Sequence, residues 1–187
     1  LHPDRATLLV TGGSLGAERL YERFLDGLEA AVATDPGLAQ RIQVIHAVGK
    51  TESSSAERYA ALGVAHHVVP YLDPMGQAYR TADLVLCRAG ANTCAELVAT
   101  RSPAVLVPYP FHTDRQQFKN AEALVACGGA RLIEQERLDP AAVARDVLAL
   151  LEDPRAQAGM RTALQAETAD GATAAADDLV RFLGWEG

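Results

Sequence analysis

Short apolar runs alternate with segments of helical periodicity along this chain. Residues 7–11, 84–87 and 104–107 are apolar runs that are bounded by breakers and are too short for ordinary helices, a pattern typical of buried strands. Residues 17 to about 33 instead carry apolar side chains at the spacing of an amphipathic helix. Because strands and helices alternate about six times, the sequence predicts an α/β fold with a parallel sheet and helices on both faces.

The other predicted elements continue this alternation. Asn92 or Thr93 is expected to cap the central helix. Asp114 and Asp139 are the expected caps of the next two helices, the second with Pro140 in its first turn. The predicted strands are residues 7–11, 42–48, 67–69, 84–87, 104–107 and 131–133. The predicted helices are residues 17–33, 53–62, 75–82, 93–100, 114–126 and 140–151, another from Asp153 onward, and a tail helix at about residues 171–183.

Composition narrows the class of protein. The 187 residues suit one domain, and 49% hydrophobic residues suffice for a sizeable core. A net charge of −7 argues against a nucleic-acid partner. Cys87, Cys94 and Cys127 form no Cys-x-x-Cys pair, so we interpret them as small hydrophobic side chains in a reduced, cytosolic protein. No signal peptide and no apolar run near 18 residues is present, so no transmembrane span is expected.

Polar residues gather where two neighbouring strands end. In an open parallel sheet, ligands bind outside the carboxyl ends of the strands, so both clusters are expected at one edge. A helix that opens near Thr93 presents free backbone N–H groups to an anion, and Glu96 lies one turn further along, within reach of a sugar hydroxyl. The first cluster comprises Arg88, Gly90, Asn92 and Thr93, and the second comprises Pro108, Pro110, His112, Asp114, Gln116 and Gln117.

A glycine-rich turn follows the first strand, at Gly12, Gly13, Ser14 and Gly16. Strand, glycine turn and helix is the order of a phosphate-binding loop. The spacing differs from the dinucleotide Gly-x-Gly-x-x-Gly motif, and the Gly-Lys-Ser/Thr of a P-loop is missing. A tight structural turn and an anion site therefore both remain open for this segment.

The chain lacks the usual residues for metal-assisted or hydrolytic chemistry. No Asp-x-Asp pair is present to bridge a metal to a diphosphate, and no Gly-x-Ser-x-Gly elbow is present. His112 is interpreted as an ordinary loop residue, so the catalytic residue is unknown. The remaining groups suit a nucleotide sugar, and we expect donor binding without a metal or other cofactor.

Four motifs, in this order along the chain, resemble the bacterial MurG family of N-acetylglucosaminyltransferases. Residues 12–17 resemble its Gly-Gly-Ser-x-Gly-Ala loop, and residues 71–75 its Phe-Ile-x-x-Met segment. Residues 87–96 resemble Cys-Arg-Ser-Gly-Ala-x-Thr-x-x-Glu, and residues 108–121 resemble Pro-(Phe/Tyr)…His-x-Asp-x-Gln-Gln-x-x-Asn-Ala. The resemblance covers nearly the whole chain, but only the C-terminal, donor-binding half of the family.

The resemblance implies a GT-B fold, in which two Rossmann-like domains enclose the active site. Residues 1–187 would form the C-terminal UDP-GlcNAc-binding domain, and the N-terminal acceptor domain is absent. The resemblance places the Leu72 backbone on uracil, Glu96 on the ribose, and Thr93 near the diphosphate. The implied substrate-binding residues are Ser14, Leu72, Met75, Asn92, Thr93, Glu96, Gln116 and Gln117, with the two glutamines on GlcNAc and with Gly12, Gly13 and Gly16 as the phosphate loop.

The family also implies an activity and a location. The full-length protein would transfer GlcNAc from UDP-GlcNAc to undecaprenyl-pyrophosphoryl-MurNAc-pentapeptide, converting lipid I to lipid II with inversion. It would be cytoplasmic and peripheral on the inner face of the bacterial membrane. The present chain, which we expect to be a fragment because it begins at Leu1 without Met, would not catalyse transfer alone.

Two other interpretations remain. The chain is alternatively a stand-alone nucleotide-sugar-binding subunit of a split UDP-GlcNAc transferase. A non-hydrolysing sugar-nucleotide epimerase shares the fold, but its catalytic motifs are not found in this sequence. Two positions depart from the family, which often has Gln at Leu15 and Ser at Ala89, so neither residue is assigned a role.

Overall fold

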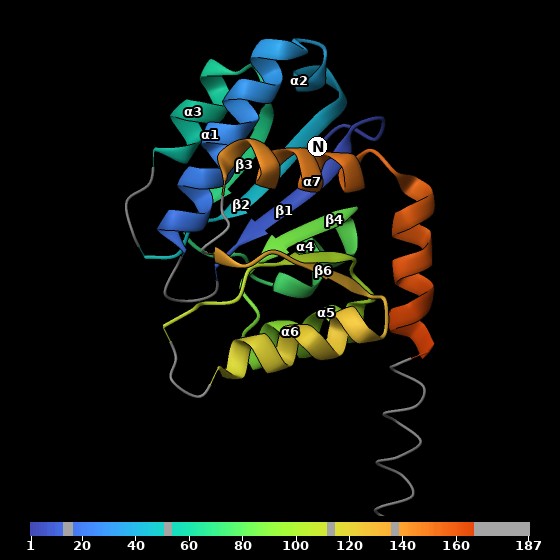
Figure 1. Ribbon diagram of the computed structural model, residues 1–187. Coiled ribbons are helices and arrows are strands. Elements are labelled where there is room, and N and C mark those ends of the chain that lie inside the picture. Colours follow the sequence, from blue (N-terminus) through green and yellow to red (C-terminus); the bar gives the residue numbers. More distant parts are fainter. Residues whose placement is uncertain (13–16, 51–53, 112–114, 136–138, 167–187) are drawn as a thin grey trace, which may run out of the picture.

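Six parallel strands form one sheet in the order β3-β2-β1-β4-β5-β6 (Figure 1). The computed structural model describes residues 1–12, 17–50, 54–111, 115–135 and 139–166. Because the chain turns back from β3 to place β4 beside β1, the strand order reverses at the β1–β4 pair. The strands are β1 (Ala6–Thr11), β2 (Ile42–Ala47), β3 (Ala65–Val69), β4 (Leu84–Cys87), β5 (Ala104–Leu106) and β6 (Ala130–Leu132).

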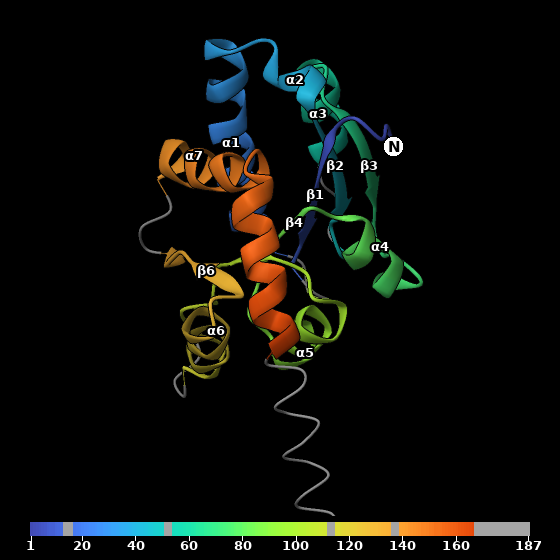
Figure 2. The same cartoon turned by 90° about the vertical axis from the view of Figure 1, so that its right-hand side faces the viewer.

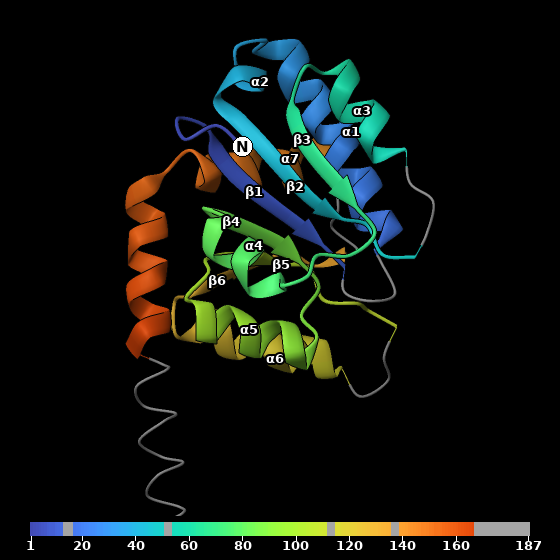
Figure 3. The same cartoon turned by 180° about the vertical axis from the view of Figure 1, so that it is seen from behind.

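Helices cover both faces of this sheet, as the sequence predicted. One face carries α1, α3 and α7, and the other carries α4, α5 and α6 (Figures 1 and 3). A short helix, α2, precedes β2 and was not predicted. The helices are α1 (Glu18–Thr34), α2 (Leu38–Arg41), α3 (Ser55–Ala61), α4 (Met75–Thr81), α5 (Ala91–Thr100), α6 (Gln116–Ala126) and α7 (Pro140–Leu151), followed by a helix over residues 154–166.

The apolar strands supply two cores, because successive side chains of a strand point to opposite faces. In β4, Leu84 and Leu86 pack beneath α1 and α7, whereas Val85 and Cys87 pack against α4 and α5. All four residues are fully buried. Burial on both faces explains why these strands are continuous apolar runs rather than alternating ones.

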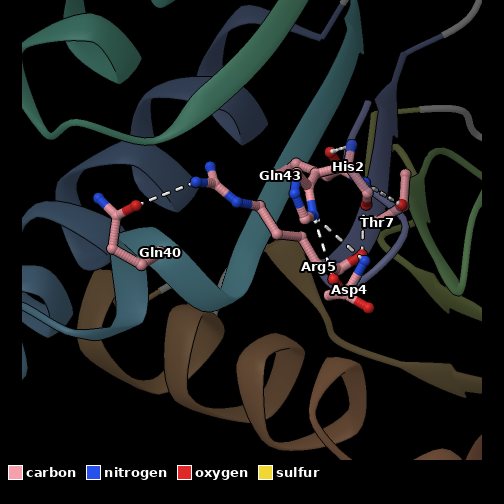
Figure 4. A network of polar contacts seen from close by, with 6 residues as sticks. All are labelled: His2, Asp4, Arg5, Thr7, Gln40 and Gln43. Carbon is pink, nitrogen blue, oxygen red and sulfur yellow. Dashed lines mark hydrogen bonds and ion pairs between the residues drawn. The ribbon is translucent and has the colours of Figure 1, made fainter.

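A buried glutamine fixes the amino ends of the first two strands. The Gln43 side chain in β2 accepts a hydrogen bond from the His2 backbone N–H at 2.7 Å (Figure 4). Its amide nitrogen donates to the His2 carbonyl at 2.9 Å, to the Arg5 carbonyl at 3.3 Å and to the Thr7 hydroxyl at 2.9 Å. These bonds satisfy a polar side chain that is only 2% exposed, and they tie the first residues to the sheet.

The helix over residues 154–166 crosses the amino ends of β4 and β5. Its Arg161 guanidinium donates to the carbonyls of Ala82 at 3.2 Å and Arg101 at 3.4 Å, which precede these strands. Figures 1 and 2 show this orange-red helix beside the sheet, and in Figure 1 it lies opposite the strand arrowheads. The carboxyl edge of the sheet is therefore not covered by this helix.

Helix α7 and the helix over residues 154–166 both begin where the sequence predicts, but only the second has the predicted side-chain cap. Asp153 caps the last described helix as expected, since its Oδ1 accepts from the backbone N–H groups of Arg155 and Ala156, each at 3.0 Å. Asp139 occupies the predicted cap position of α7, but its side chain makes no capping hydrogen bond.

Two predicted caps are wrong. The central helix α5 begins at Ala91 with Gly90 as its N-cap, not Asn92 or Thr93, and no side chain makes a capping hydrogen bond there. Helix α6 begins at Gln116 with Arg115 as its N-cap in the left-handed region, whereas Asp114 lies outside the described residues. The predicted tail helix at about residues 171–183 also lies outside the described residues.

The close contact between α1 and α7 predicts that replacing one glycine of α1 destabilises the fold. Gly27 lies in α1 directly beneath α7, and a methyl group there would overlap the Pro140 carbonyl and lie 2.6 Å from Ala144 Cβ. We expect Gly27→Ala to lower the free energy of unfolding by about 1–3 kcal/mol, although alanine favours helix by about 1 kcal/mol. Urea unfolding measures this change.

Gly159 provides the matched control. It is exposed in the helix 154–166, and a methyl group there meets no atom within 4 Å. Gly159→Ala should therefore raise the free energy of unfolding by up to about 1 kcal/mol. Equal stabilisation by both substitutions would contradict the close packing of α1 against α7.

Candidate functional site

Two of the predicted anion-binding elements meet at the centre of the sheet. In the parallel pairing of β1 with β4, Thr11 lies beside Cys87. Gly12 follows the first of these residues and Arg88 the second, so these two residues leave the sheet side by side. This is the position where the strand order reverses, at which open parallel sheets bind their ligands.

Helix α5 brings two of the predicted binding residues onto one face. Thr93 and Glu96 lie one turn apart in α5. Thr93 is half-buried and Glu96 is exposed, whereas Cys94 and Leu97 of the same helix are buried in the core. Asn92 is exposed in the first turn of α5. The start of α5 therefore presents a hydroxyl, an amide and a carboxylate at the carboxyl edge of the sheet.

Arg88 fixes three post-strand segments relative to one another. Its guanidinium donates to the Val107 carbonyl at 3.0 Å and to Gln135 Oε1 at 2.6 Å, and it lies over the Tyr109 ring at 5.6 Å. The side chain is 8% exposed, and this burial lowers the pKa of Arg88. Sequence analysis named Arg88 but assigned it no role, because no local pattern reveals a partner 47 residues away.

The first turn of α6 reaches the β4–α5 loop. Gln116 Nε2 donates to Asn120 Oδ1 at 3.1 Å, and Asn120 Nδ2 donates to the Ala89 carbonyl at 3.0 Å. Gln117 Oε1 accepts a hydrogen bond from the Tyr109 backbone N–H at 2.9 Å. The two glutamines predicted to bind GlcNAc are therefore the first two residues of α6, and Asn120 links this helix to the β4–α5 loop.

Leu72 and Met75 stand somewhat apart from this cluster. Both are partly buried and pack against the core beneath α4 and α5. Leu72 lines an open depression of about 430 Å³ between α4 and strands β2 and β3, which also includes His67 and Gln77. Of the predicted substrate-binding residues, Leu72 is the one that lines this depression.

The surroundings of Gly12 are closely packed. A side chain at Gly12 would lie 2.5 Å from the Tyr21 hydroxyl, which explains the glycine. Tyr21 donates to the Ala47 carbonyl at 3.3 Å and meets the His46 ring edge-on at 4.3 Å. Burial raises the pKa of Tyr21 to about 12. Gly13, Ser14, Gly16 and His112, all named from the sequence, lie outside the described residues.

The described residues include neither a cluster of metal ligands nor a membrane-spanning helix. Within the described ranges, no three His, Cys, Asp or Glu side chains are grouped so that they could hold a metal ion. In the same part of the chain, no helix combines the length and hydropathy needed to cross a bilayer. The cysteines Cys87, Cys94 and Cys127 are free thiols, the first two buried as predicted.

The strand order defines a Rossmann-like domain of the glycosyltransferase type, with polar groups where the order reverses. The sequence profile of the glycosyltransferase family 28 C-terminal domain matches residues 7–175, and the chain belongs to this family. The predicted resemblance to the C-terminal domain of MurG is thereby confirmed.

Bacterial relatives agree with this assignment. The chain is 42% identical over 161 residues to the UDP-N-acetylglucosamine–N-acetylmuramyl-(pentapeptide) pyrophosphoryl-undecaprenol N-acetylglucosamine transferase of Chromohalobacter salexigens, covering 86% of this chain. It is 39% identical over 157 residues to the protein of the same name from Anaeromyxobacter sp. strain K, covering 83% of this chain. The chain spans 43% and 40% of the length of these two relatives.

Solved structures agree on the fold. Acinetobacter baumannii MurG matches with a TM-score of 0.73 at 29% identity, over 86% of this chain and 47% of that one. The calicheamicin glycosyltransferase CalG4 matches with a TM-score of 0.64 over 98% of this chain and 43% of that one, and at 22% identity it supports the fold alone. The predicted fold, the Rossmann-like half of a GT-B glycosyltransferase, is confirmed.

A buried histidine of β2 predicts that the fold is acid-sensitive. His46 is fully buried, hydrogen-bonds through Nδ1 to the Tyr59 hydroxyl at 3.3 Å, and has a pKa that burial lowers to about 3. Because the unfolded chain binds this proton below pH 6.5 and the folded chain does not, stability should fall as pH decreases from 6.5 toward 3. The expected slope from this group is roughly 1.4 kcal/mol per pH unit.

The measurement is the free energy of urea unfolding between pH 7 and pH 4.5 for the wild type and for His46→Leu. The substitution should reduce the pH dependence of the free energy of unfolding by the equivalent of about one bound proton. His67→Gln is the control, because His67 is exposed in β3 and should leave the slope almost unchanged. Identical slopes for the wild type and His46→Leu would disprove the prediction.

Proposed function

We propose that this chain is the donor-binding domain of an inverting glycosyltransferase that takes GlcNAc from UDP-GlcNAc. The acceptor is undecaprenyl-pyrophosphoryl-MurNAc-pentapeptide, so that the full-length enzyme converts lipid I to lipid II. The relatives bear this activity in their names, and the observation that carries the proposal for this chain is the placement of Thr93 and Glu96 one turn apart near the start of α5.

The chemistry of UDP accounts for this arrangement. The ribose offers two hydroxyl groups, and the Glu96 carboxylate accepts hydrogen bonds from both. The diphosphate carries negative charge that free N–H groups at the start of α5 stabilise, together with the Thr93 hydroxyl and the turn Gly12, Gly13, Ser14 and Gly16. Uracil lies against the backbone of Leu72, with Met75 beside it.

The sugar and the acceptor complete the assignment. GlcNAc lies against Gln116 and Gln117, with Asn92 at the nearby start of α5. The acceptor hydroxyl attacks the anomeric carbon as the bond to UDP breaks, which inverts that carbon and leaves the charge on the departing diphosphate. Stabilising this charge is the contribution of the donor domain to catalysis. Acceptor binding and proton removal are assigned to a second, N-terminal domain.

The full-length enzyme is proposed to act at the cytoplasmic face of the membrane as a peripheral protein, because its acceptor is a membrane lipid. No nucleic-acid partner is proposed, since the chain carries a net charge of −7. Donor binding is proposed to need no metal ion, because the helix start and the glycine-rich turn supply the compensating charge.

Removal of the Glu96 carboxylate should weaken UDP binding. Each charge-assisted hydrogen bond to a ribose hydroxyl contributes at most roughly 1.5–3 kcal/mol, so Glu96→Ala should raise the Kd for UDP roughly ten- to a hundredfold. Isothermal titration of the 187-residue chain measures the Kd. Because Glu96 is exposed, thermal unfolding should change little.

The control ligand is 2′,3′-dideoxy-UDP, which lacks both hydroxyls. Its affinity should hardly change in Glu96→Ala. The ribose assignment is wrong if UDP binds the variant as tightly as the wild type, or if both ligands lose affinity equally.

Chelation should leave donor binding intact. Backbone N–H groups rather than a cation are assigned to the diphosphate. An excess of EDTA, on the order of 1 mM, should therefore not change the Kd for UDP or UDP-GlcNAc. The comparison is a titration of the 187-residue chain with and without the chelator. A loss of affinity that Mg²⁺ or Mn²⁺ restores would contradict metal-independent binding.

A further inference from the structure

A buried glutamine that follows β6 holds the Arg88 guanidinium in place. Gln135 is 4% exposed, and its Oε1 atom accepts a hydrogen bond from Arg88 Nη2 at 2.6 Å. Arg88 Nη1 donates to the carbonyls of Val107 at 3.0 Å and Pro108 at 3.4 Å. Because the guanidinium fork is planar and rigid, the bond to Gln135 fixes the direction in which Arg88 meets the segment after β5.

The segment that Arg88 holds is bonded to one of the predicted sugar-binding side chains. The Tyr109 ring centroid lies 5.6 Å from the Arg88 guanidinium carbon. The Tyr109 backbone N–H donates to Gln117 Oε1 at 2.9 Å. Because a backbone N–H group only donates, the Gln117 oxygen must face Tyr109, and the amide nitrogen lies at the other side of the group. The orientation of Gln117 therefore depends on the position of the Tyr109 main chain.

Two successive residues of the β4–α5 loop hold both ends of the connection from β5 to α6. Arg88 bonds to carbonyls at its start, whereas the Ala89 carbonyl accepts from Asn120 Nδ2 of α6 at 3.0 Å. Asn120 Oδ1 in turn accepts from Gln116 Nε2 at 3.1 Å. The loop thus sets the position of the first two residues of α6, and Gln135 ties the loop to the segment after β6.

We propose that Gln135, acting through Arg88 on Gln117, is a positioning residue for the sugar end of the nucleotide-sugar donor. The inference rests on the proposed function, because that function assigns GlcNAc to Gln116 and Gln117. A main-chain segment that is held before the donor arrives loses less conformational freedom when the sugar binds. UDP has no sugar at this end, so its affinity does not depend on the contact between Gln135 and Arg88.

The test is Gln135→Met, which keeps the length of the side chain and removes the hydrogen-bond acceptor. We expect the Kd for UDP-GlcNAc to rise about three- to tenfold, because Arg88 loses a charge-assisted bond and holds the segment after β5 less firmly. The Kd for UDP should change less than about twofold. Isothermal titration of the 187-residue chain measures each Kd.

Two further substitutions of Gln135 complete this test. Gln135→Glu keeps an acceptor oxygen at the same length, so it should bind UDP and UDP-GlcNAc like the wild type. Gln135→Asn withdraws the amide by one methylene and replaces Gln135→Met if that variant does not fold. It should raise the Kd for UDP-GlcNAc about two- to threefold and leave the Kd for UDP unchanged.

Gln157→Met is the matched control. Gln157 is also a buried glutamine, 6% exposed, and its amide nitrogen donates to the carbonyls of Leu150 and Leu151 at 2.9 Å each. These bonds join the helix over residues 154–166 to the end of α7, which carries no predicted substrate-binding residue. The variant should lower the thermal unfolding temperature and leave both Kd values unchanged. If it weakens UDP-GlcNAc binding as Gln135→Met does, a general loss of stability explains both results and overturns the positioning role.

Gln117→Ala separates this inference from the proposed function. It should raise the Kd for UDP-GlcNAc, and in this background Gln135→Met should add little, because the side chain that it positions is gone. If Gln117→Ala weakens UDP-GlcNAc binding and Gln135→Met does not, the positioning role is wrong and the sugar assignment stands. If Gln117→Ala leaves UDP-GlcNAc binding unchanged, the sugar assignment fails and the inference fails with it.

Three other results would also overturn the positioning role. The first is that Gln135→Met weakens UDP and UDP-GlcNAc equally, which would place the effect of Arg88 at the UDP end of the donor. The second is that Gln135→Glu binds UDP-GlcNAc as weakly as Gln135→Met. The third is that the effects of Gln135→Met and Gln117→Ala multiply in the double variant, as independent sites do.

Discussion

The parallel pairing of β1 with β4 determines where everything else in this protein lies. Because Thr11 lies beside Cys87 in this pair, the segments that follow leave the sheet together, one toward the glycine-rich turn and the other toward α5. Strand order reverses at the same place, so the helices on either side diverge and leave the sheet edge open there. The two apolar faces of β4 bury this pair completely, which makes the position rigid.

The two edges of the sheet differ in how their polar groups are used. At the amino edge, the side chains of Gln43, Asp83 and Arg161 bond to the backbone and lock the strands in place. At the carboxyl edge, Arg88 and Asn120 bond to loop carbonyls, while Glu96 stays exposed. The amino edge therefore serves stability, and the carboxyl edge supports groups that face solvent.

Buried side chains support the segments at the carboxyl edge of the sheet. Arg88 joins three post-strand segments, and Tyr21 lies directly under Gly12. Each of these side chains is largely buried and spans two or more elements. Buried side chains thus hold the segments that follow the strands in place, an arrangement that reduces the ordering cost when a ligand binds.

The sequence by itself determined the local structure and the family. Apolar runs and helical periodicity placed every strand and most helices, since those patterns reflect which faces are buried, and ordered motifs identified the donor-binding half of a MurG-type enzyme. Only the tertiary structure decided the strand order, the cap of α5 at Gly90, and the partners of Arg88 and Asn120. These contacts join residues on different elements, and they depend on how the crossovers bring those elements together, which no local spacing records.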